Sequence, residues 1–458
     1  MSSKEDLKKY FLAVAFLAVI MIALPVMVRF AKNPSLAGTE SYYHARMALE
    51  LAEKWVSKDV AIVGERVYVP HPYHVLLAGG YSFLGARVFT LFPFIFALAG
   101  FGLFWRLLEF FNVEQERKLW TLLAYALSPP FIASGFLNTP HAFVLVLLLA
   151  GLLLLATRLW FAGAFLILLA AFSGIPAMVA AIVLLLFLLF TRKGNAKVHA
   201  TLILLIVVLL ATGYYSPAIA PNGGIAHYLS DIGGIYGFGI FAFLLAIVGA
   251  LQTWKHKKLY YGAYGTGIAF FIASFLFPDV LVFANVLVSV LAGVALANLA
   301  LRKWQLDFLR GAVLLVIFCG LLFSGVSQGV SLAKLPPSAD FFDALSLPRG
   351  VVLSDEKYGF WIEAAGHRAM IDSLVDDPLR HDDVRRLLNA TDLDLARSLF
   401  EKYNVTYVLI THEMENGLFW QRENQGLSFL TSNEGVFRKV QETQGARVWE
   451  VTWKKRKE

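Results

Sequence analysis

The stretch Gly38-Thr39-Glu40-Ser41-Tyr42-Tyr43-His44-Ala45-Arg46-Met47 directly follows the first apolar segment of the chain. Its opening glycine and threonine are residue types that end a turn and cap a helix, so the sequence predicts a helix that begins near Glu40. On this helix Glu40 and His44 share one face, and Arg46 lies on a neighbouring face. A carboxylate and an imidazole can bind a divalent metal ion or transfer a proton, and an arginine can hold a phosphate. An equally open interpretation is a solvated amphipathic helix on a bilayer, with the arginine on lipid phosphate.

Apolar runs dominate the rest of the chain. Hydrophobic residues make up 58% of the 458 residues, charged residues make up 16%, and the mean hydropathy is +0.63. These values lie far from those of soluble domains. We therefore expect a polytopic α-helical membrane protein with about eleven spans. The spans are predicted near residues 11–29, 88–109, 118–134, 140–157, 160–173, 175–191, 198–214, 234–254, 259–277, 280–300 and 309–330.

The polar segments predict two domains. Residues 1–335 are expected to form a transmembrane domain with a large first external loop at 30–87, in which Pro72–Leu84 is an interfacial helix too short to cross. Residues 336–458 are polar enough to form a separate external α/β domain. Strands are expected at 351–353, 406–411, 436–440 and 446–453, and helices at 340–345 and 393–403.

The distribution of lysine and arginine predicts the orientation. Three lysines precede the first span, and basic loops then alternate with loops that contain neither residue. By the positive-inside rule the N-terminus is cytoplasmic, and an odd number of spans places the first loop and the C-terminal domain outside. The net charge of +7 follows from this pattern and does not indicate nucleic-acid binding. The basic positions are Lys4, Lys8, Lys9, Arg106, Arg117, Lys118, Arg158, Arg192, Lys193, Lys197, Lys255, Lys257, Lys258, Arg302, Lys303 and Arg310; the loops without such residues are Ser134–Thr139, Tyr215–Gly233 and Phe277–Asp279.

The reactive side chains gather in the predicted external loops. No Asp, Glu, Lys, Arg or His lies deep inside a predicted span, whereas ion-coupled transporters carry such groups at mid-membrane. A site at the outer membrane surface is therefore favoured over a transporter or flippase. The external set comprises Glu40, His44, Arg46, Arg66, His71, His74, Asn138, His141, His227, Asp231 and Asp279.

Two sequons lie in the predicted external domain, Asn389-Ala390-Thr391 and Asn404-Val405-Thr406. The second runs into a predicted buried strand, so only Asn389 is expected to accept a glycan.

Four stretches, in their order and sidedness, carry a resemblance. They are Glu40–Arg46, Ser128–Gly135, Phe277–Gly293 and Val352–Gly359, the last followed by Arg368 and Tyr403–Val408. Together they resemble the GT-C membrane glycosyltransferases, and most closely the catalytic subunit of archaeal oligosaccharyltransferase. The first stretch is similar to the acidic-x-Tyr-Tyr-His-x-Arg start of the first external loop of that family. The fourth is similar to its soluble-domain strand and Trp-Trp-Asp-Tyr-Gly motif.

The resemblance implies transfer of a sugar from a polyprenyl (dolichyl) phosphate or diphosphate carrier, at the external face of the bilayer, to a protein or glycan acceptor. In that scheme a metal ion neutralises the leaving phosphate and a carboxylate activates the acceptor. The residues implied are Glu40 and Asp231 as catalytic carboxylates; Arg46, Arg66, His71 and His74 at the donor phosphate; Glu40, His44, Asn138 and His141 as ligands of Mn²⁺ or Mg²⁺; and Lys357, Tyr358 and Gly359 on the acceptor side.

The chain departs from the family pattern at two positions. No carboxylate stands at Asn138–His141, where the second acidic motif is expected, and Lys357 replaces the aspartate of the acceptor motif. A lysine cannot accept a hydrogen bond from a hydroxyl group. A non-catalytic relative that binds the lipid carrier or a partner therefore stays open. Helix capping is the plain alternative for Asp231, and a helix start for Asp279.

Overall fold

The computed structural model describes residues 4–69, 71–155, 157–190, 196–212, 225–421 and 425–452. Arg192, Lys193, part of the predicted Tyr215–Gly233 loop and the last residues of the predicted 446–453 strand and C-terminal tail lie outside these ranges. The chain divides into two compact units. The first comprises Met1–Ala31, His71–Leu77 and Leu84–Leu335; the second comprises Lys32–Pro70, Ala78–Phe83 and Pro336–Glu458. Most of the first polar loop thus clusters with the C-terminal segment, whereas the sequence grouped it with the transmembrane domain.

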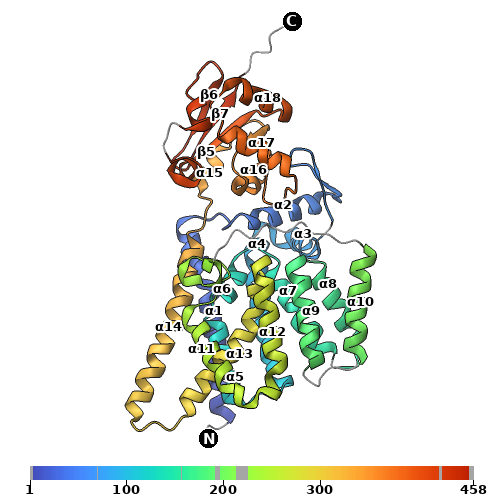
Figure 1. Cartoon of the computed structure of the whole chain (residues 1–458), viewed down its shortest axis with the longest axis vertical. Helices are drawn as coiled ribbons and strands as arrows, with labels where there is room; N and C mark the ends of the chain where they lie inside the picture. Colours follow the sequence, from blue (N-terminus) through green and yellow to red (C-terminus); the bar gives the residue numbers. More distant parts are fainter. Residues whose placement is uncertain are drawn as a thin grey trace. The chain divides into compact units, whose positions relative to one another are not determined.

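The first unit consists of apolar helices that run lengthwise beside one another (Figure 1). Each predicted span coincides with one helix, or with the pair α5–α6, which bends by 56°. Among the described residues, four helices are long and apolar enough to cross a bilayer, or five if the bent pair is one span. Five further apolar helices in these ranges have 10–17 residues. The helices are α1 (Lys4–Lys32), α4 (Val88–Phe110), α5 (Gln115–Ala126), α6 (Pro129–Phe136), α7 (His141–Leu155), α8 (Trp160–Ala171), α9 (Ile175–Phe190), α10 (Ala196–Thr212), α11 (Ile240–Thr253), α12 (Lys257–Leu276), α13 (Val280–Leu301) and α14 (Asp307–Ala333). Helix α3 (Pro72–Leu84) forms where a short interfacial helix was predicted and is divided between the two units.

Small residues allow α13 to pack closely on α11 and α5. A Cβ atom on Gly249 of α11 would lie 2.0 Å from the carbonyl oxygen of Leu291, and one on Gly293 would lie 2.2 Å from Thr121 Oγ1. In a bilayer, where hydrophobicity drives helices together only weakly, such close backbone packing supplies much of the association energy.

The second unit contains a five-stranded sheet of order β4-β3-β5-β7-β6. β3 (Val351–Leu353) pairs in parallel with β4 (Arg368–Ala369) and with β5 (Tyr407–Thr411), and β5, β7 (Ala446–Val451) and β6 (Phe437–Glu442) form an antiparallel meander. The predicted α/β character and four strands are confirmed, and so are helices α15 (Ala339–Ala344) and α18 (Leu393–Tyr403). The short elements β4, α16 (Gly359–Ala364), α17 (Pro378–Leu388) and α19 (Gly426–Leu430) were not predicted.

The polar loop adds an edge to this sheet. It forms α2 (Glu40–Glu53) and a hairpin of β1 (Lys58–Asp59) and β2 (Arg66–Val67). Beyond β1, Ile62 bridges Ala369 in parallel; Ala369 N donates to Ala61 O at 2.9 Å, and Val63 N donates to Ala369 O at 3.0 Å. Ile62 is buried in the same apolar core as Val352. Two segments about 300 residues apart in sequence therefore share one core.

Candidate functional site

Helix α2 begins at Glu40, as predicted, but its start is held differently. The Thr39 side chain makes no capping hydrogen bond. Instead Gly38 adopts a left-handed φ of 78°, its N–H donates to Pro336 O at 2.9 Å, and its carbonyl accepts from Trp361 Nε1 at 3.3 Å. The C-terminal segment therefore positions Gly38, two residues before Glu40.

His44 and Arg46 are each only 8% exposed. The interpretation of α2 as a solvated helix with its arginine on lipid phosphate is therefore wrong. The helix packs on α16, and Tyr43 contacts Phe360 with ring centroids 5.0 Å apart.

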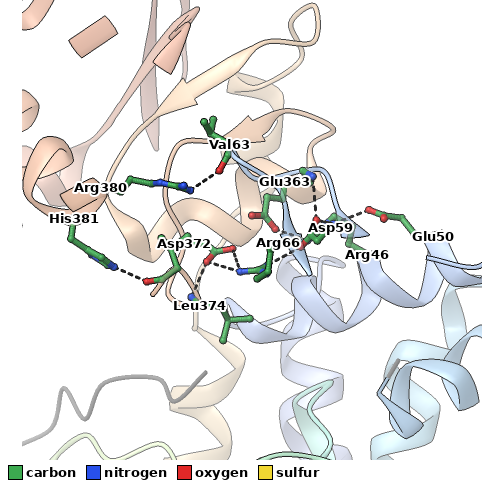
Figure 2. A network of polar contacts seen from close by, with 12 residues as sticks. Arg46, Glu50, Asp59, Val63, Arg66, Glu363, Asp372, Leu374, Arg380 and His381 are labelled. Atoms are coloured by element: carbon green, nitrogen blue, oxygen red, sulfur yellow. Dashed lines mark hydrogen bonds and ion pairs between the residues drawn. The ribbon is translucent and has the colours of Figure 1, made fainter. Parts of the chain in front are cut away.

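Arg46 binds three carboxylates (Figure 2). Its Nη1 donates to Glu50 Oε1 at 2.7 Å and to Asp59 Oδ1 at 2.8 Å. Its Nη2 donates to Asp59 Oδ2 at 2.8 Å and to Glu363 Oε2 at 2.7 Å. The bond to Glu363 joins residues 317 positions apart, so this hydrogen bond ties α2 to α16.

Arg66 completes the network from the hairpin. Asp59 and Arg66 are directly paired in the β1–β2 register, so their side chains share one face. Arg66 Nη2 donates to Asp59 Oδ2 at 2.7 Å, and Nη1 donates to both oxygens of Asp372 at 2.9 and 3.0 Å. The Tyr43 ring lies beside both guanidiniums, 5.9 Å from that of Arg46 and 5.5 Å from that of Arg66.

The charges of this network determine its protonation. Burial alone would raise the pKa of Asp59, but hydrogen bonds and charge from Arg46 and Arg66 outweigh it and hold that pKa below its usual value. Burial raises the pKa of Glu363 well above its usual value, and the opposing charge of Arg46 does not cancel this effect. The proximity of Asp372 raises it further, through charge and a hydrogen bond. Glu363 Oε1 is buried without a donor, which a neutral carboxyl that donates to Asp372 resolves.

These contacts bear on the predicted phosphate ligands. The four terminal N–H groups of Arg46 meet carboxylates, and only its buried Nε has no hydrogen-bond partner in the described structure. Arg66 is likewise bound to Asp59 and Asp372. Both predicted phosphate donors thus serve a buried internal network, and their geometry gives phosphate binding no support.

The predicted acceptor-side residues gather around a carboxylate that the sequence analysis did not select. Tyr358 OH donates to Glu413 Oε2 at 3.0 Å and accepts from Thr411 Oγ1 at 2.9 Å. Lys357 Nζ donates to Glu413 Oε1 at 2.6 Å. Burial opposes the effect, but the hydrogen bond and charge of Lys357 lower the pKa of Glu413 below its usual value. Gly359 is required here, since a Cβ atom would lie 2.4 Å from Ile371 O.

In the first unit, the histidine of the Pro-Tyr turn has local partners. His71 Nε2 lies 2.9 Å from Ser173 O, and His71 Nδ1 accepts from Tyr73 N at 3.1 Å. These contacts require the neutral tautomer with the proton on Nε2. His74 is buried and contacts the His71 ring at a centroid distance of 5.0 Å. Asn138 Oδ1 accepts from the buried Tyr73 hydroxyl at 2.8 Å.

The structure brings a carboxylate to His141. Asp279 Oδ2 lies 3.9 Å from His141 Nε2, and this buried ring nitrogen has no hydrogen-bond partner in the described structure. Asp279 makes no side-chain cap on α13 although it occupies the capping position. The Tyr236 ring packs edge-on against His141 at 4.8 Å.

Asp231 caps a helix, which the sequence analysis gave as the alternative to a catalytic role. Its Oδ2 accepts from the first N–H of α11, Ile240 N, at 2.7 Å, and its Oδ1 accepts from Ser324 Oγ of α14 at 2.8 Å. The carboxylate thereby caps α11 and links it to α14.

The predicted metal ligands do not form a complete set within either unit. Glu40 and His44 lie on α2 in the second unit, and Asn138 and His141 belong to the first. The described residues contain no group of three or more His, Cys, Asp or Glu side chains that could hold a metal ion. Hard divalent cations prefer several oxygen ligands, and neither unit brings such a set together in the part of the chain that the structure describes.

Solved structures have a similar fold over most of this chain. Archaeal oligosaccharyltransferase AglB from Archaeoglobus fulgidus matches with a TM-score of 0.65 at 14% identity, over 94% of this chain and 73% of that one. ArnT from Cupriavidus metallidurans in its apo state matches with a TM-score of 0.58 at 13% identity, over 94% of this chain and 97% of that one. Both are GT-C membrane glycosyltransferases.

This chain has the GT-C fold. The predicted resemblance is confirmed at the level of the fold. No family model and no curated protein matches the sequence. At 13–14% identity the likeness does not extend to substrate or activity.

Proposed function

We propose that this chain is a membrane glycosyltransferase that takes a sugar from a polyprenyl phosphate or diphosphate carrier at the extracytoplasmic face. The observation that carries the proposal is the extent of the fold match to proteins that bind such carriers. ArnT bound to undecaprenyl phosphate matches over 98% of both chains with a TM-score of 0.59. The AglB structure that matches over 94% of this chain contains a dolichol-phosphate and a peptide.

Glu40 is the proposed catalytic carboxylate. It takes the proton of the acceptor nucleophile as that group attacks the anomeric carbon, and the carrier phosphate leaves with the electrons of the broken C–O bond. The network of Arg46, Asp59, Arg66, Glu363 and Asp372 keeps α2 in place, so that Glu40 is presented from a rigid helix.

Asp279 and His141 are proposed as a further pair of functional polar residues, in addition to Glu40. Asp279 supplies the carboxylate that the sequence lacks at Asn138–His141, and it lies near a buried imidazole nitrogen without a partner in the described structure. We retain His74 as a proposed ligand of the carrier phosphate. No step is assigned to a metal ion, although a structure of an oligosaccharyltransferase from Archaeoglobus fulgidus contains zinc and sulfate.

The acceptor is proposed to bind beside Lys357, Tyr358 and Gly359. Glu413 offers there the carboxylate oxygens that a hydroxyl-bearing acceptor needs and that Lys357 cannot provide. An acceptor peptide containing the NVT sequon was tethered to an oligosaccharyltransferase from Archaeoglobus fulgidus, which makes peptides the first acceptors to assay.

The test is a transfer assay with purified protein in lipid nanodiscs, polyprenyl-linked sugars as donors, and peptide or glycan acceptors. We expect Glu40→Gln to reduce transfer by roughly 10²-fold or more, within the range for loss of a general base. The matched control is Glu53→Gln, which alters an exposed residue at the end of the same helix and should leave transfer unchanged. An unchanged rate for Glu40→Gln would remove Glu40 from catalysis.

A non-catalytic lipid-binding relative is the second candidate. It is favoured by the internal use of both predicted phosphate arginines. The same preparations distinguish it, because saturable binding of polyprenyl phosphate without turnover on any donor would support this candidate over the enzyme.

A further inference from the structure

Asn389 lies at an exposed junction between two helices of the second unit. It follows the last residue of α17, and the loop from Asn389 to Asp392 leads into α18. Its Nδ2 donates to Arg385 O at 2.9 Å, a terminal carbonyl of the helix. Thr391, the third residue of the sequon, is also exposed.

The second sequon differs in how its threonine is used. Thr406 N donates to Val351 O at 2.9 Å, and Thr406 Oγ1 accepts from Val351 N at 3.3 Å. Its carbonyl accepts from Val451 N at 2.9 Å. All three polar groups of Thr406 therefore belong to the sheet, and a transferase could engage them only after β3 and β5 separate.

A hollow of about 660 Å³ opens beside the first sequon, and Thr391 and Asp392 form part of its lining. The Phe429 side chain, 52% exposed, forms another part, together with Asn433. Helix α19, which carries Phe429, packs closely against Asn389, since a Cβ atom on Gly426 of this helix would lie 3.1 Å from Asn389 Cα. The volume lies in the range of small-molecule sites, about 300–1,000 Å³.

The lining suits a sugar ring. An exposed aromatic face can pack against the C–H face of a pyranose, because the ring quadrupole attracts positively polarised hydrogens. Asp392 uses Oδ1 to cap α18, and Asn433 uses Oδ1 to accept from Gly435 N at 3.1 Å. Asp392 Oδ2 and Asn433 Nδ2 then offer an acceptor and a donor to sugar hydroxyl groups.

We propose that Asn389 is an N-glycosylation site and that the first sugar of its glycan packs in this hollow against Phe429. In the transfer, Asn389 Nδ2 forms a bond to the anomeric carbon of a sugar carried on polyprenyl diphosphate. The C–O bond to the phosphate breaks, the diphosphate leaves with its electron pair, and one amide proton passes to the base of the transferring enzyme. The proposal rests on the outward orientation of the C-terminal segment and not on catalysis by this chain.

The first test is glycopeptide mass spectrometry of the full-length protein purified from its own membranes. We expect a glycan on the peptide that contains Asn389 and an unmodified peptide around Asn404. Thr391→Val should abolish the modification, whereas Thr391→Ser, which keeps the hydroxyl, should retain it. An unmodified Asn389 peptide, or equal occupancy at Asn404, would overturn the assignment even if the chain transfers sugar.

The second test addresses the hollow. The melting temperature is compared between glycosylated and unglycosylated protein, in the wild type and in Phe429→Ala, as a cycle that isolates the coupling between glycan and ring. We expect the glycan to raise the melting temperature of the wild type and to lose at least half of this effect in Phe429→Ala. The same effect in both backgrounds would refute the packing of the sugar on Phe429.

Discussion

Replacing Arg46 by methionine should destabilise the second unit more than replacing an exposed charged residue does. The substitution retains the volume of the side-chain stem. It removes one of the two arginines bound to the buried Asp59 and the arginine bound to the buried Glu363. Removing one partner of a buried ion pair costs about 3–5 kcal/mol. The lower end of that range applies, because Asp59 keeps its bond to Arg66 and Glu363 can take up a proton. We therefore expect a loss of about 3 kcal/mol.

The matched control is Arg397→Met on α18. Arg397 also binds a glutamate four residues away, Glu401, at 2.9 Å, but its side chain is 45% exposed. Exposed pairs of this kind contribute about 0–1 kcal/mol. Both variants are measured as full-length protein in detergent, by thermal unfolding monitored through tryptophan fluorescence. At roughly 2–4 °C per kcal/mol for a domain of 150–250 residues, Arg46→Met should lower the melting temperature by about 6–12 °C and Arg397→Met by at most a few degrees.

A double substitution separates the network from general damage to α2. Buried ion pairs can often be replaced by apolar groups without loss of stability. Arg46→Met combined with Glu363→Leu should therefore recover part of the lost melting temperature. If Arg46→Met and Arg397→Met have the same melting temperature, the carboxylates around Arg46 are not desolvated as their burial indicates. That result would refute a stabilising role for the buried network.

Three further outcomes follow from the structure. Burial raises the pKa of Glu363, so the folded form holds this proton more tightly than the unfolded form. The stability that this proton contributes is complete below the unfolded pKa and is lost as the pH rises towards the folded pKa. Glu363→Gln should therefore remove this pH-dependent loss of stability in melting curves recorded from pH 5 to 9. Asp231→Ala should lower the free energy of unfolding by about 1–2 kcal/mol, because the N–H of Ile240 loses its cap. If sugar transfer per folded molecule also fell sharply, a purely structural role for Asp231 would be contradicted. Gly249→Ala, whose Cβ would lie 2.0 Å from a backbone oxygen, should reduce the yield of monodisperse protein, whereas Gly102→Ala, with nothing within 4 Å, should not; equal yields would refute close packing at α11.

Periodic features of the fold were predictable. The apolar runs mark every helix of the first unit, and the boundaries of β3 and α18 agree with the structure. Alternation and amphipathicity suffice there because each signal lies within one segment. The start of α11 at Ile240, and not near residue 234, was missed because the intervening glycines form a turn; Gly233 has a φ of 110°. The two-residue strands β1, β2 and β4 exist only through their pairing and leave no periodic trace.

The candidate site was predictable in its residues and not in its contacts. The sequence selected Arg46 and Arg66 as phosphate ligands and His141 as a metal ligand. It could not show that Arg46 meets Glu363, that Arg66 meets Asp372, or that His141 meets Asp279, since these partners lie more than 130 positions away. Glu413 was missed because its partners Lys357 and Tyr358 lie 56 and 55 positions away, in a different segment of the chain. The one available signal was composition, because acidic residues within apolar surroundings, such as Glu363 in Gly-Phe-Trp-Ile-Glu, are seldom left unpaired.

The pattern around Glu40 shows why a short motif does not determine the role of each of its members. Glu40 and Arg46 are six residues apart on one helix. Arg46 forms ion pairs with three carboxylates, whereas Glu40 begins the helix at a half-buried position. A guanidinium whose terminal donors are all bound cannot also neutralise a phosphate without abandoning buried anions, a step that would cost several kcal/mol. If α2 carries chemistry, its arginine therefore acts through position, and the cation that meets the carrier phosphate must come from another part of the chain. Transfer assays that separate these roles should find Arg46→Met restored by compensating apolar packing and Glu40→Gln not restored by any change in packing.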